Sequence, residues 1–261
     1  MPARKHEAAV GRDKKKVKHT AFRQPRADAK LLSRRCHPYA PHPASNPAAT
    51  TLVAILGDSN TVGYPAREFA SPEAATYPTW LAQQSRSSDE TPSLEVRTVA
   101  RTGATVVGDG SSNPRLRDTP RFENYVKMSP RPSVIIIALG TNDIDVFARR
   151  WRAKQNCAPE IQREAIGLME LLRQLDPLVP IVVLSPLCAK IDSARTTVSQ
   201  ALACAASQDR NSTFIATEGW VLEFASDKKH LTPRGHCQLA NQLLHTVGMA
   251  LRRGALASRS G

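Results

Sequence analysis

Three residues of this chain have the types needed for nucleophilic acyl transfer. Ser59 follows an apolar run, in the segment Leu56-Gly-Asp-Ser-Asn-Thr61, and Asp227 and His230 stand three residues apart nearer the carboxyl end. A serine hydroxyl is a poor nucleophile until a neighbouring base removes its proton, and that base is usually a histidine oriented by a carboxylate. The spacing Asp-x-x-His brings both side chains to one side of a turn. We therefore expect His230 to accept the Ser59 proton while Asp227 orients the imidazole.

Attack on an ester carbonyl creates an oxyanion, which needs preorganised hydrogen-bond donors. The sequence offers three: the backbone N–H of Ser59 at a helix start, the backbone N–H of Gly103 and the side-chain amide of Asn142. Each motif also has a structural interpretation. Gly-Asp-Ser is often a helix cap, Gly-Thr-Asn-Asp is common in turns, and Gly103 suits a backbone that only glycine adopts readily. Their joint occurrence, in order and near the ends of predicted strands, favours catalysis.

A strand–helix alternation is expected to position these residues. From about residue 51, short apolar runs alternate with longer amphipathic ones, and several runs are apolar on both faces, as in parallel strands covered by helices. Strands are predicted at 51–56, 94–99, 134–139, 181–184 and 213–216. Helices are predicted near 73–85, 158–175 and 194–208. The pattern predicts one doubly wound α/β domain over residues 49–254, with ligands bound at the carboxyl ends of its strands.

The last helix has the clearest boundaries. Thr232 suits the N-cap and Pro233 suits the first helical position, where no amide hydrogen is needed. Its apolar stripe consists of Leu239, Leu243, Val247 and Ala250. Gly254 follows two arginines and predicts the end of this helix, with residues 255–261 as a flexible tail.

The ordered motifs resemble those of the SGNH (GDSL) hydrolase superfamily from about residue 52 to 250. Leu56-Gly-Asp-Ser-Asn-Thr-Val-Gly63 resembles the nucleophile block, Leu139-Gly-Thr-Asn-Asp143 the asparagine block and Asp227-Lys-Lys-His-Leu-Thr-Pro-Arg-Gly-His236 the final block. Gly103 falls where the oxyanion glycine is expected, although the asparagine that often precedes it in the family is missing here. The resemblance implies a flavodoxin-like three-layer α/β fold. It also implies ester hydrolysis through an acyl-enzyme, with no metal or organic cofactor.

The substrate and reaction type remain open at this level. The superfamily includes carbohydrate and aryl esterases, lysophospholipases, thioesterases and acyltransferases, and we expect a small-molecule acyl ester. An acyltransferase with the same triad and a catalytically idle carbohydrate- or polyanion-binding member are the alternatives. Phe147 and Trp151 either border an acyl pocket or pack ordinarily, and the arginines at 149, 150 and 152 face either an anionic substrate or solvent.

Other catalytic motifs are missing or incomplete. Thr61 replaces the last glycine of a Gly-x-Ser-x-Gly elbow, which argues against the α/β-hydrolase fold. The sequence has no Gly-x-x-x-x-Gly-Lys phosphate loop and no His-Glu-x-x-His zinc motif. Ser185 is a second possible nucleophile, but no acid–base pair is tied to it. His236 and His245 fall on the last helix, where packing or solvent exposure accounts for them.

The basic charge is concentrated in the first fifty residues, which hold twelve Lys or Arg against three acidic residues, within a net charge of +13. We expect residues 1–48 to be a disordered extension. It is a solvated tail, the product of a wrongly assigned start, or a basic arm for a polyanion such as nucleic acid or an anionic membrane. No apolar segment resembles a signal peptide or a membrane span, which favours the cytoplasm, or secretion if the start is wrong.

The five cysteines include no C-x-x-C pair, which argues against a structural zinc site. Cys157 and Cys188 fall in predicted loops after successive strands. They either form a disulfide or remain reduced, and the missing signal sequence favours reduced thiols.

Overall fold

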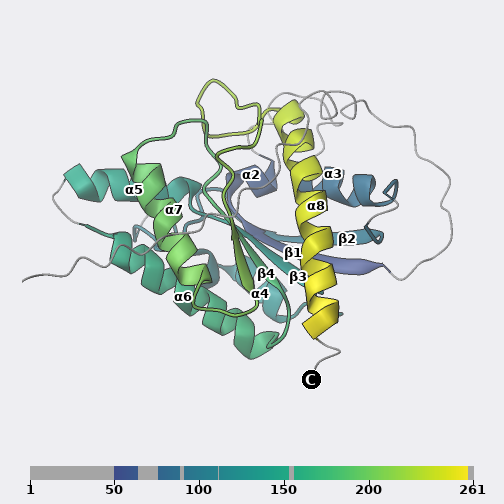
Figure 1. Ribbon diagram of the computed structural model, residues 1–261. Coiled ribbons are helices and arrows are strands. Elements are labelled where there is room, and N and C mark those ends of the chain that lie inside the picture. Colours follow the sequence, from purple (N-terminus) through teal and green to yellow (C-terminus); the bar gives the residue numbers. More distant parts are fainter. Residues whose placement is uncertain (1–49, 64–75, 89–90, 111, 153–155, 258–261) are drawn as a thin grey trace, which may run out of the picture.

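Five parallel strands form the central sheet of the computed structural model, which describes residues 50–63, 76–88, 91–110, 112–152 and 156–257 (Figure 1). The strands are β1 (Thr51–Gly57), β2 (Leu94–Ala100), β3 (Val134–Ala138), β4 (Ile181–Leu184) and β5 (Ser212–Ile215). They lie in the order β2-β1-β3-β4-β5, and every neighbouring pair is parallel. This is the flavodoxin-like order, so the predicted fold class is confirmed.

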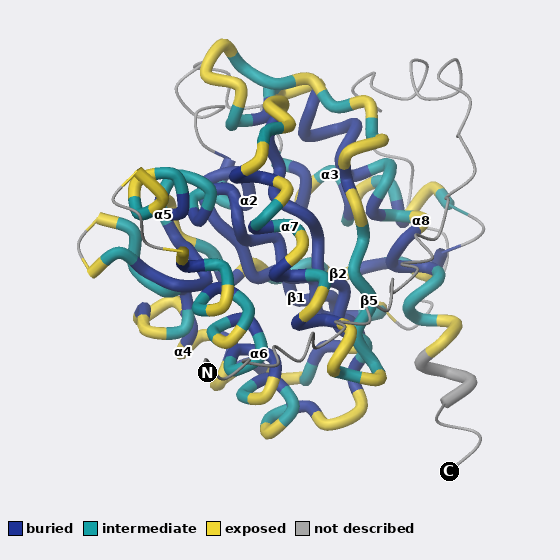
Figure 2. Tube along the Cα trace, turned by 60° about the vertical axis from the view of Figure 1, so that its left-hand side comes forward, coloured by how far each residue is buried: buried dark blue, intermediate teal, exposed yellow. Residues whose placement is uncertain are grey.

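Both faces of the sheet are buried, which explains its continuous apolar runs. In β1, Leu52, Ala54 and Leu56 pack into one hydrophobic cluster, while Val53 and Ile55 pack into another on the opposite face. Figure 2 shows the buried strands at the centre, with exposed residues on the outer loops and helix faces.

Helices cover each face of the sheet and make the three layers (Figure 1). The helices are α2 (Ser59–Val62), α3 (Tyr77–Ser85), η1 (Leu116–Asp118), α4 (Pro120–Val126), α5 (Thr141–Arg152), α6 (Ala158–Leu175), α7 (Ser193–Ala206) and α8 (Pro233–Ala257). Side chains of α3 and α8 belong to the cluster on one face, and those of α4, α5, α6 and α7 to the cluster on the other. No helix in the described ranges is long and apolar enough to cross a membrane.

The register of the sheet places three chain segments at one edge. Gly57, the last residue of β1, pairs with Ala100 of β2 and with Ala138 of β3. The three strands therefore end at the same level. As a result, Ser59, the loop after β2 and the start of α5 all lie beyond the same edge, where ligands bind in this kind of fold.

The predicted elements are correct, with small differences at their ends. Four strands end or begin one residue from the predicted position, β4 coincides with its prediction, and α6 has the predicted bounds. Helix α3 begins at Tyr77, after the N-cap Thr76, and the predicted start at residue 73 lies outside the described residues. The short α4 and the twelve-residue α5 were not predicted; for α5, the segment around Asn142 was interpreted as a turn.

One predicted helix end is wrong. Thr232 caps α8 as expected, since its hydroxyl accepts a hydrogen bond of 3.1 Å from the Gly235 N–H. However, α8 continues through Gly254 to Ala257. A glycine inside a helix costs about 1 kcal/mol relative to alanine, and the following Ala-Leu-Ala has high helix propensity, which favours continuation. The predicted extension over residues 1–48 lies outside the described part of the chain.

Candidate active site

Ser59 opens helix α2 directly beyond β1. The Asp58 side chain caps this helix, because its Oδ1 accepts the Asn60 N–H at 3.0 Å, and Gly63 ends it in the left-handed conformation. Gly57 is needed for this tight fold-back, since a Cβ there would stand 1.8 Å from the Thr61 hydroxyl. The serine therefore sits at a sharp strand-to-helix turn with its backbone N–H at the start of the helix.

The structure brings the three predicted residues of the triad together. The Ser59 Oγ lies 2.9 Å from Nε2 of His230, and Nδ1 of the same ring lies 2.5 Å from Oδ2 of Asp227. The second aspartate oxygen accepts the backbone N–H groups of Lys229 at 2.9 Å and His230 at 3.0 Å. One turn of the loop before α8 thus orients both the carboxylate and the imidazole toward the serine.

The electrostatics of Asp227 suit an orienting carboxylate. Partial burial acts to raise its pKa, but the hydrogen bonds from the His230 and Lys229 backbone and from the His230 ring outweigh it and lower the pKa to about 2. Asp227 therefore stays ionised at neutral pH and favours the proton on Nδ1. That tautomer leaves the lone pair of Nε2 facing the serine hydroxyl.

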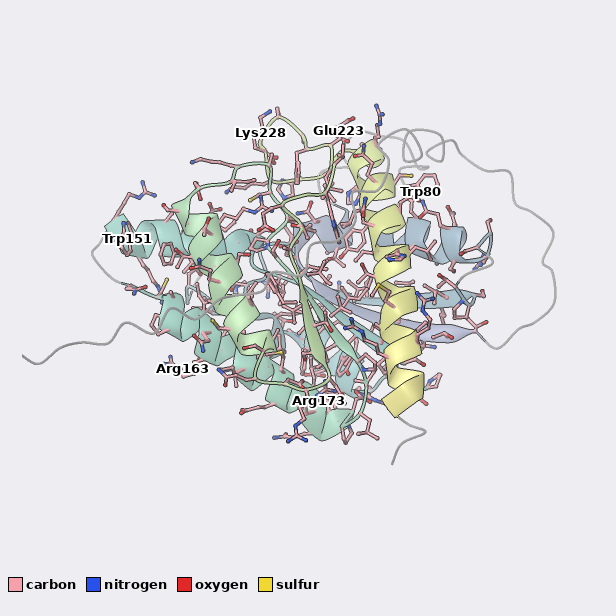
Figure 3. The ribbon with its side chains drawn as sticks, in the orientation of Figure 1. Trp80, Trp151, Arg163, Arg173, Glu223 and Lys228 are labelled. Carbon is pink, nitrogen blue, oxygen red and sulfur yellow. The ribbon has the colours of Figure 1, made fainter. Side chains whose placement is uncertain are left out.

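The loop that carries the pair is held by backbone bonds on both sides. Lys228 adopts a positive φ of 63°, a conformation that residues other than glycine rarely adopt, at the top of the loop in Figure 3. Its N–H donates to the Ala225 carbonyl at 3.0 Å, and its carbonyl accepts the Ala189 N–H at 2.8 Å. These bonds fix the turn between Asp227 and His230 despite its unfavourable dihedral angle.

Asn60 joins the serine turn to the histidine loop, a role that the sequence analysis did not identify. Its side chain is fully buried, donates from Nδ2 to the Lys229 carbonyl at 3.1 Å and accepts the Leu231 N–H at 3.0 Å. These two bonds flank His230 and fix its distance from Ser59. The one sequence signal was an amide, able to donate and accept, next to the serine.

Asn60→Ala is expected to lower kcat by about tenfold to hundredfold with a smaller change in KM, because a displacement of the base by a fraction of an ångström weakens proton transfer. Steady-state hydrolysis of a p-nitrophenyl ester measures both constants. Asn241→Ala, on α8, is the matched control and should retain the wild-type kcat. An Asn60→Ala protein with unchanged kcat would show that the two hydrogen bonds of Asn60 do not position His230.

The predicted oxyanion donors Gly103 and Asn142 lie on adjoining segments. Gly103 has a positive φ of 76°, and a Cβ there would stand 3.2 Å from the Ser112 carbonyl oxygen, so the position favours glycine. Asn142 lies in the first turn of α5 and donates from Nδ2 to the Ala104 carbonyl at 3.0 Å. This bond uses one of the two amide hydrogens. No hydrogen bond among the described residues joins Gly103 or Asn142 directly to Ser59.

Asp143 holds the Gly103 loop against α5, a second role missed from sequence. The Val106 N–H lies 3.0 Å from each of its carboxylate oxygens, and the Val107 N–H donates to Oδ1 at 3.0 Å. Together with the Asn142 bond, these contacts fix the segment that follows Gly103. Nothing in the local sequence identifies the two valine amides, which lie more than 35 residues away.

The other candidate residues have structural partners. The buried Ser185 hydroxyl lies 2.8 Å from the Thr217 hydroxyl and 3.3 Å from a carboxylate oxygen of Glu218. His236 stacks on Tyr77, with ring centroids 6.1 Å apart, and burial lowers its pKa to about 4, so the ring is neutral. His245 is exposed. Packing and solvent exposure account for both histidines.

The possible acyl-pocket residues of α5 fit the packing interpretation. Phe147 is buried in the core, and Trp151 is 61% exposed and stacks on it with centroids 5.7 Å apart. Figure 3 shows Trp151 at the tip of α5, away from the loop that carries Lys228. Arg149 pairs with Asp109 at 2.8 Å, and Arg150 pairs with Glu160. These two arginines therefore form ion pairs that join α5 to the neighbouring segments.

Cys157 and Cys188 are both free thiols, so the alternative of a disulfide between them is wrong in this structure. Burial raises the pKa of each thiol, which keeps both protonated and poorly reactive at neutral pH.

The chain matches the GDSL-like lipase/acylhydrolase family over residues 55–237, a span that includes Ser59, Gly103, Asn142 and His230. The chain belongs to this family. Membership indicates an acyl ester hydrolase as the general class of activity. No curated protein sequence shows a significant match to the chain.

Solved structures share the fold of this GDSL-like chain. A carbohydrate acetylesterase family member from Sinorhizobium meliloti is 18% identical with a TM-score of 0.58, covering 77% of this chain and 99% of its own. An aryl esterase from M. smegmatis is 20% identical with a TM-score of 0.54, covering 76% and 98%. A carbohydrate esterase family 2 enzyme from Corynascus thermopiles (Myceliophthora fergusii) is 17% identical with a TM-score of 0.54, covering 82% and 69%.

Proposed function

We propose that this GDSL-like protein is a serine ester hydrolase that works through a Ser59–His230–Asp227 triad. The observation that carries the proposal is the continuous chain of contacts from the Ser59 hydroxyl through the His230 ring to Asp227, with distances of 2.9 and 2.5 Å. A nucleophile, a base and a carboxylate that orients the base are the parts that acyl transfer from serine requires.

The proposed reaction has two steps. His230 accepts the Ser59 proton as Oγ attacks the acyl carbonyl, and the imidazolium then protonates the departing alcohol, which leaves an acyl group on Ser59. Water, deprotonated by His230, attacks this acyl-enzyme, and the imidazolium returns the proton to the Ser59 oxygen as the carboxylic acid is released. The backbone N–H groups of Ser59 and Gly103 and the Asn142 amide stabilise the oxyanion in both steps. No residue in this scheme requires a metal or an organic cofactor.

The proposed substrate is a small-molecule ester with a short acyl group. Two structural neighbours are described as a carbohydrate acetylesterase family member and an aryl esterase. These two descriptions name different kinds of ester. The series of p-nitrophenyl esters from acetate to octanoate tests this. We expect kcat/KM to be highest for the acetate and to fall with chain length. A folded wild-type protein that cleaves none of these esters would contradict the proposal.

Asn142→Ala is expected to lower kcat on p-nitrophenyl acetate by on the order of 10²–10³, because one oxyanion donor is lost in the transition state. KM should change less, since the substrate carbonyl carries little negative charge. Thermal unfolding checks that loss of the bond to Ala104 has not unfolded the loop. An Asn142→Ala protein with normal kcat would remove Asn142 from the oxyanion hole.

A further inference from the structure

Two carboxyl groups lie buried behind the nucleophile. Asp58, next to Ser59, is 1% exposed, and Asp143, next to Asn142, is fully buried. The two side chains are close enough for the charge of Asp143 to act on Asp58. Two ionised carboxylates in such a site repel one another without water to screen them, so one of them is expected to hold a proton.

The hydrogen bonds identify which of the two carboxyl groups is ionised. Asp143 receives N–H groups on both oxygens, from Val106 and Val107. Burial raises the pKa of Asp143 to about 6, and the N–H groups of Val106 and Val107 limit that rise, so Asp143 loses its proton at a lower pH than Asp58. Asp58 accepts one N–H on Oδ1, from Asn60, whereas its buried Oδ2 has no hydrogen-bond partner among the residues that the structure describes. The unpaired oxygen is therefore the place where a proton is held.

The other groups around Asp58 support the same assignment. Among the described residues, the titratable groups that face it are Asp143 on α5 and Tyr77 on α3, and burial raises the pKa of Tyr77, so that ring carries no charge. The Thr141 hydroxyl, which donates to the Leu187 carbonyl at 3.3 Å, and the Asn60 N–H both act to lower the pKa of Asp58, and burial outweighs them. Burial, reinforced by the charge of Asp143, raises the pKa of Asp58 to about 7.

We propose that Asp58 is a positioning residue that acts in its protonated form, capping α2 through Oδ1 while the proton on Oδ2 keeps negative charge away from the Ser59 oxyanion. The catalytic part of this inference rests on the proposed function. Loss of the proton at alkaline pH places a second negative charge beside the forming oxyanion. In a buried site such a charge opposes the transition state by a factor on the order of ten or more.

The first test is the pH profile of kcat/KM for p-nitrophenyl acetate in the wild type and in Asp58→Asn. Asparagine keeps the capping oxygen and cannot ionise. We expect the two proteins to agree within about threefold near pH 6, and we expect the wild type alone to lose activity above pH 7. At pH 9 the variant should be faster by about tenfold. The same alkaline loss in both proteins would overturn the catalytic role of the proton.

The matched control is Asp192→Asn. Asp192 caps α7 by the same kind of bond, accepting the Arg195 N–H at 2.9 Å, but it is partly exposed, and its hydrogen bonds with the Arg195 backbone and Lys190 lower its pKa. This variant makes the same change, from an N-cap aspartate to asparagine, on a different helix. We expect its kcat/KM to fall above pH 7 as that of the wild type does.

A second test does not depend on activity. A carboxyl whose pKa is higher in the folded than in the unfolded chain stabilises the fold most at low pH, and this contribution is lost as pH rises from about 4 to 7. The urea midpoint of Asp58→Asn relative to wild type should therefore rise by about 0.5–1 M between pH 5 and pH 8.5. For Asp192→Asn the difference should not rise.

The two tests separate the possible failures. A wild-type protein without esterase activity would overturn the proposed function, and the urea midpoints would still decide whether Asp58 holds a proton. A midpoint difference that is the same at both pH values would overturn the protonated state itself.

Discussion

Ser59→Ala is expected to lower kcat for p-nitrophenyl acetate by on the order of 10⁴–10⁶, with little change in KM. The hydroxyl at 2.9 Å from the His230 Nε2 is the proposed attacking group, so its removal should leave only activation of water and oxyanion stabilisation. Steady-state rates, with extra enzyme for the variant, measure the residual activity.

Ser185→Ala is the comparison for this prediction, because Ser185 also follows directly after the carboxyl end of a strand, β4. Its hydroxyl lies against Thr217 and Glu218. We expect this variant, once its folded fraction is measured, to retain kcat within about tenfold. If Ser185→Ala lost activity and Ser59→Ala kept it, the nucleophile would be wrongly assigned.

His230→Ala is expected to lower kcat by a similar factor, on the order of 10⁴–10⁶, because the serine proton then has no acceptor. Asp227→Asn should lower kcat by about 10⁴, since the asparagine amide favours the wrong imidazole tautomer. When residues act as a unit, the effects of their substitutions on kcat are not additive. The double variant Ser59→Ala/His230→Ala should therefore be no slower than either single variant, within about threefold.

Additive losses in that double variant would contradict the triad, because they would mean that the serine and the histidine act independently. Circular dichroism and thermal unfolding of each variant show whether a loss of rate has a structural cause. Lys229→Ala, which removes the ion pair with Asp145 but leaves the Asp227–His230 contact, is a suitable control on the same loop and should lower kcat by less than about tenfold.

The fold could be predicted from sequence because its signals are local. The apolar runs of β1 and β3, which are buried on both faces, predict strands by themselves. The periodic apolar stripe of α6 predicts a helix in the same way. The order of the strands came from the resemblance to a known family. The end of α8 was wrong because a single glycine is a weak stop when good helix formers follow it.

The candidate catalytic residues could be proposed from the sequence, and the residues that contact and orient them could not. Ser59, Asp227 and His230 stand out by type and spacing. Asn60 and Asp143 act through backbone atoms of Lys229, Leu231, Val106 and Val107, and those partners carry no sequence signal. The sequence identified Asp58 only as a possible helix cap, because its carboxyl neighbour Asp143 lies more than 80 residues away along the chain.

The most direct test of the central claim is covalent trapping of the nucleophile with a fluorophosphonate. The reagent should add once per chain, peptide mapping should place the adduct on Ser59, and His230→Ala should slow the addition by at least about a hundredfold. Ser59→Ala should remain unlabelled. An adduct on Ser185, or labelling of Ser59→Ala at the wild-type rate, would contradict the account.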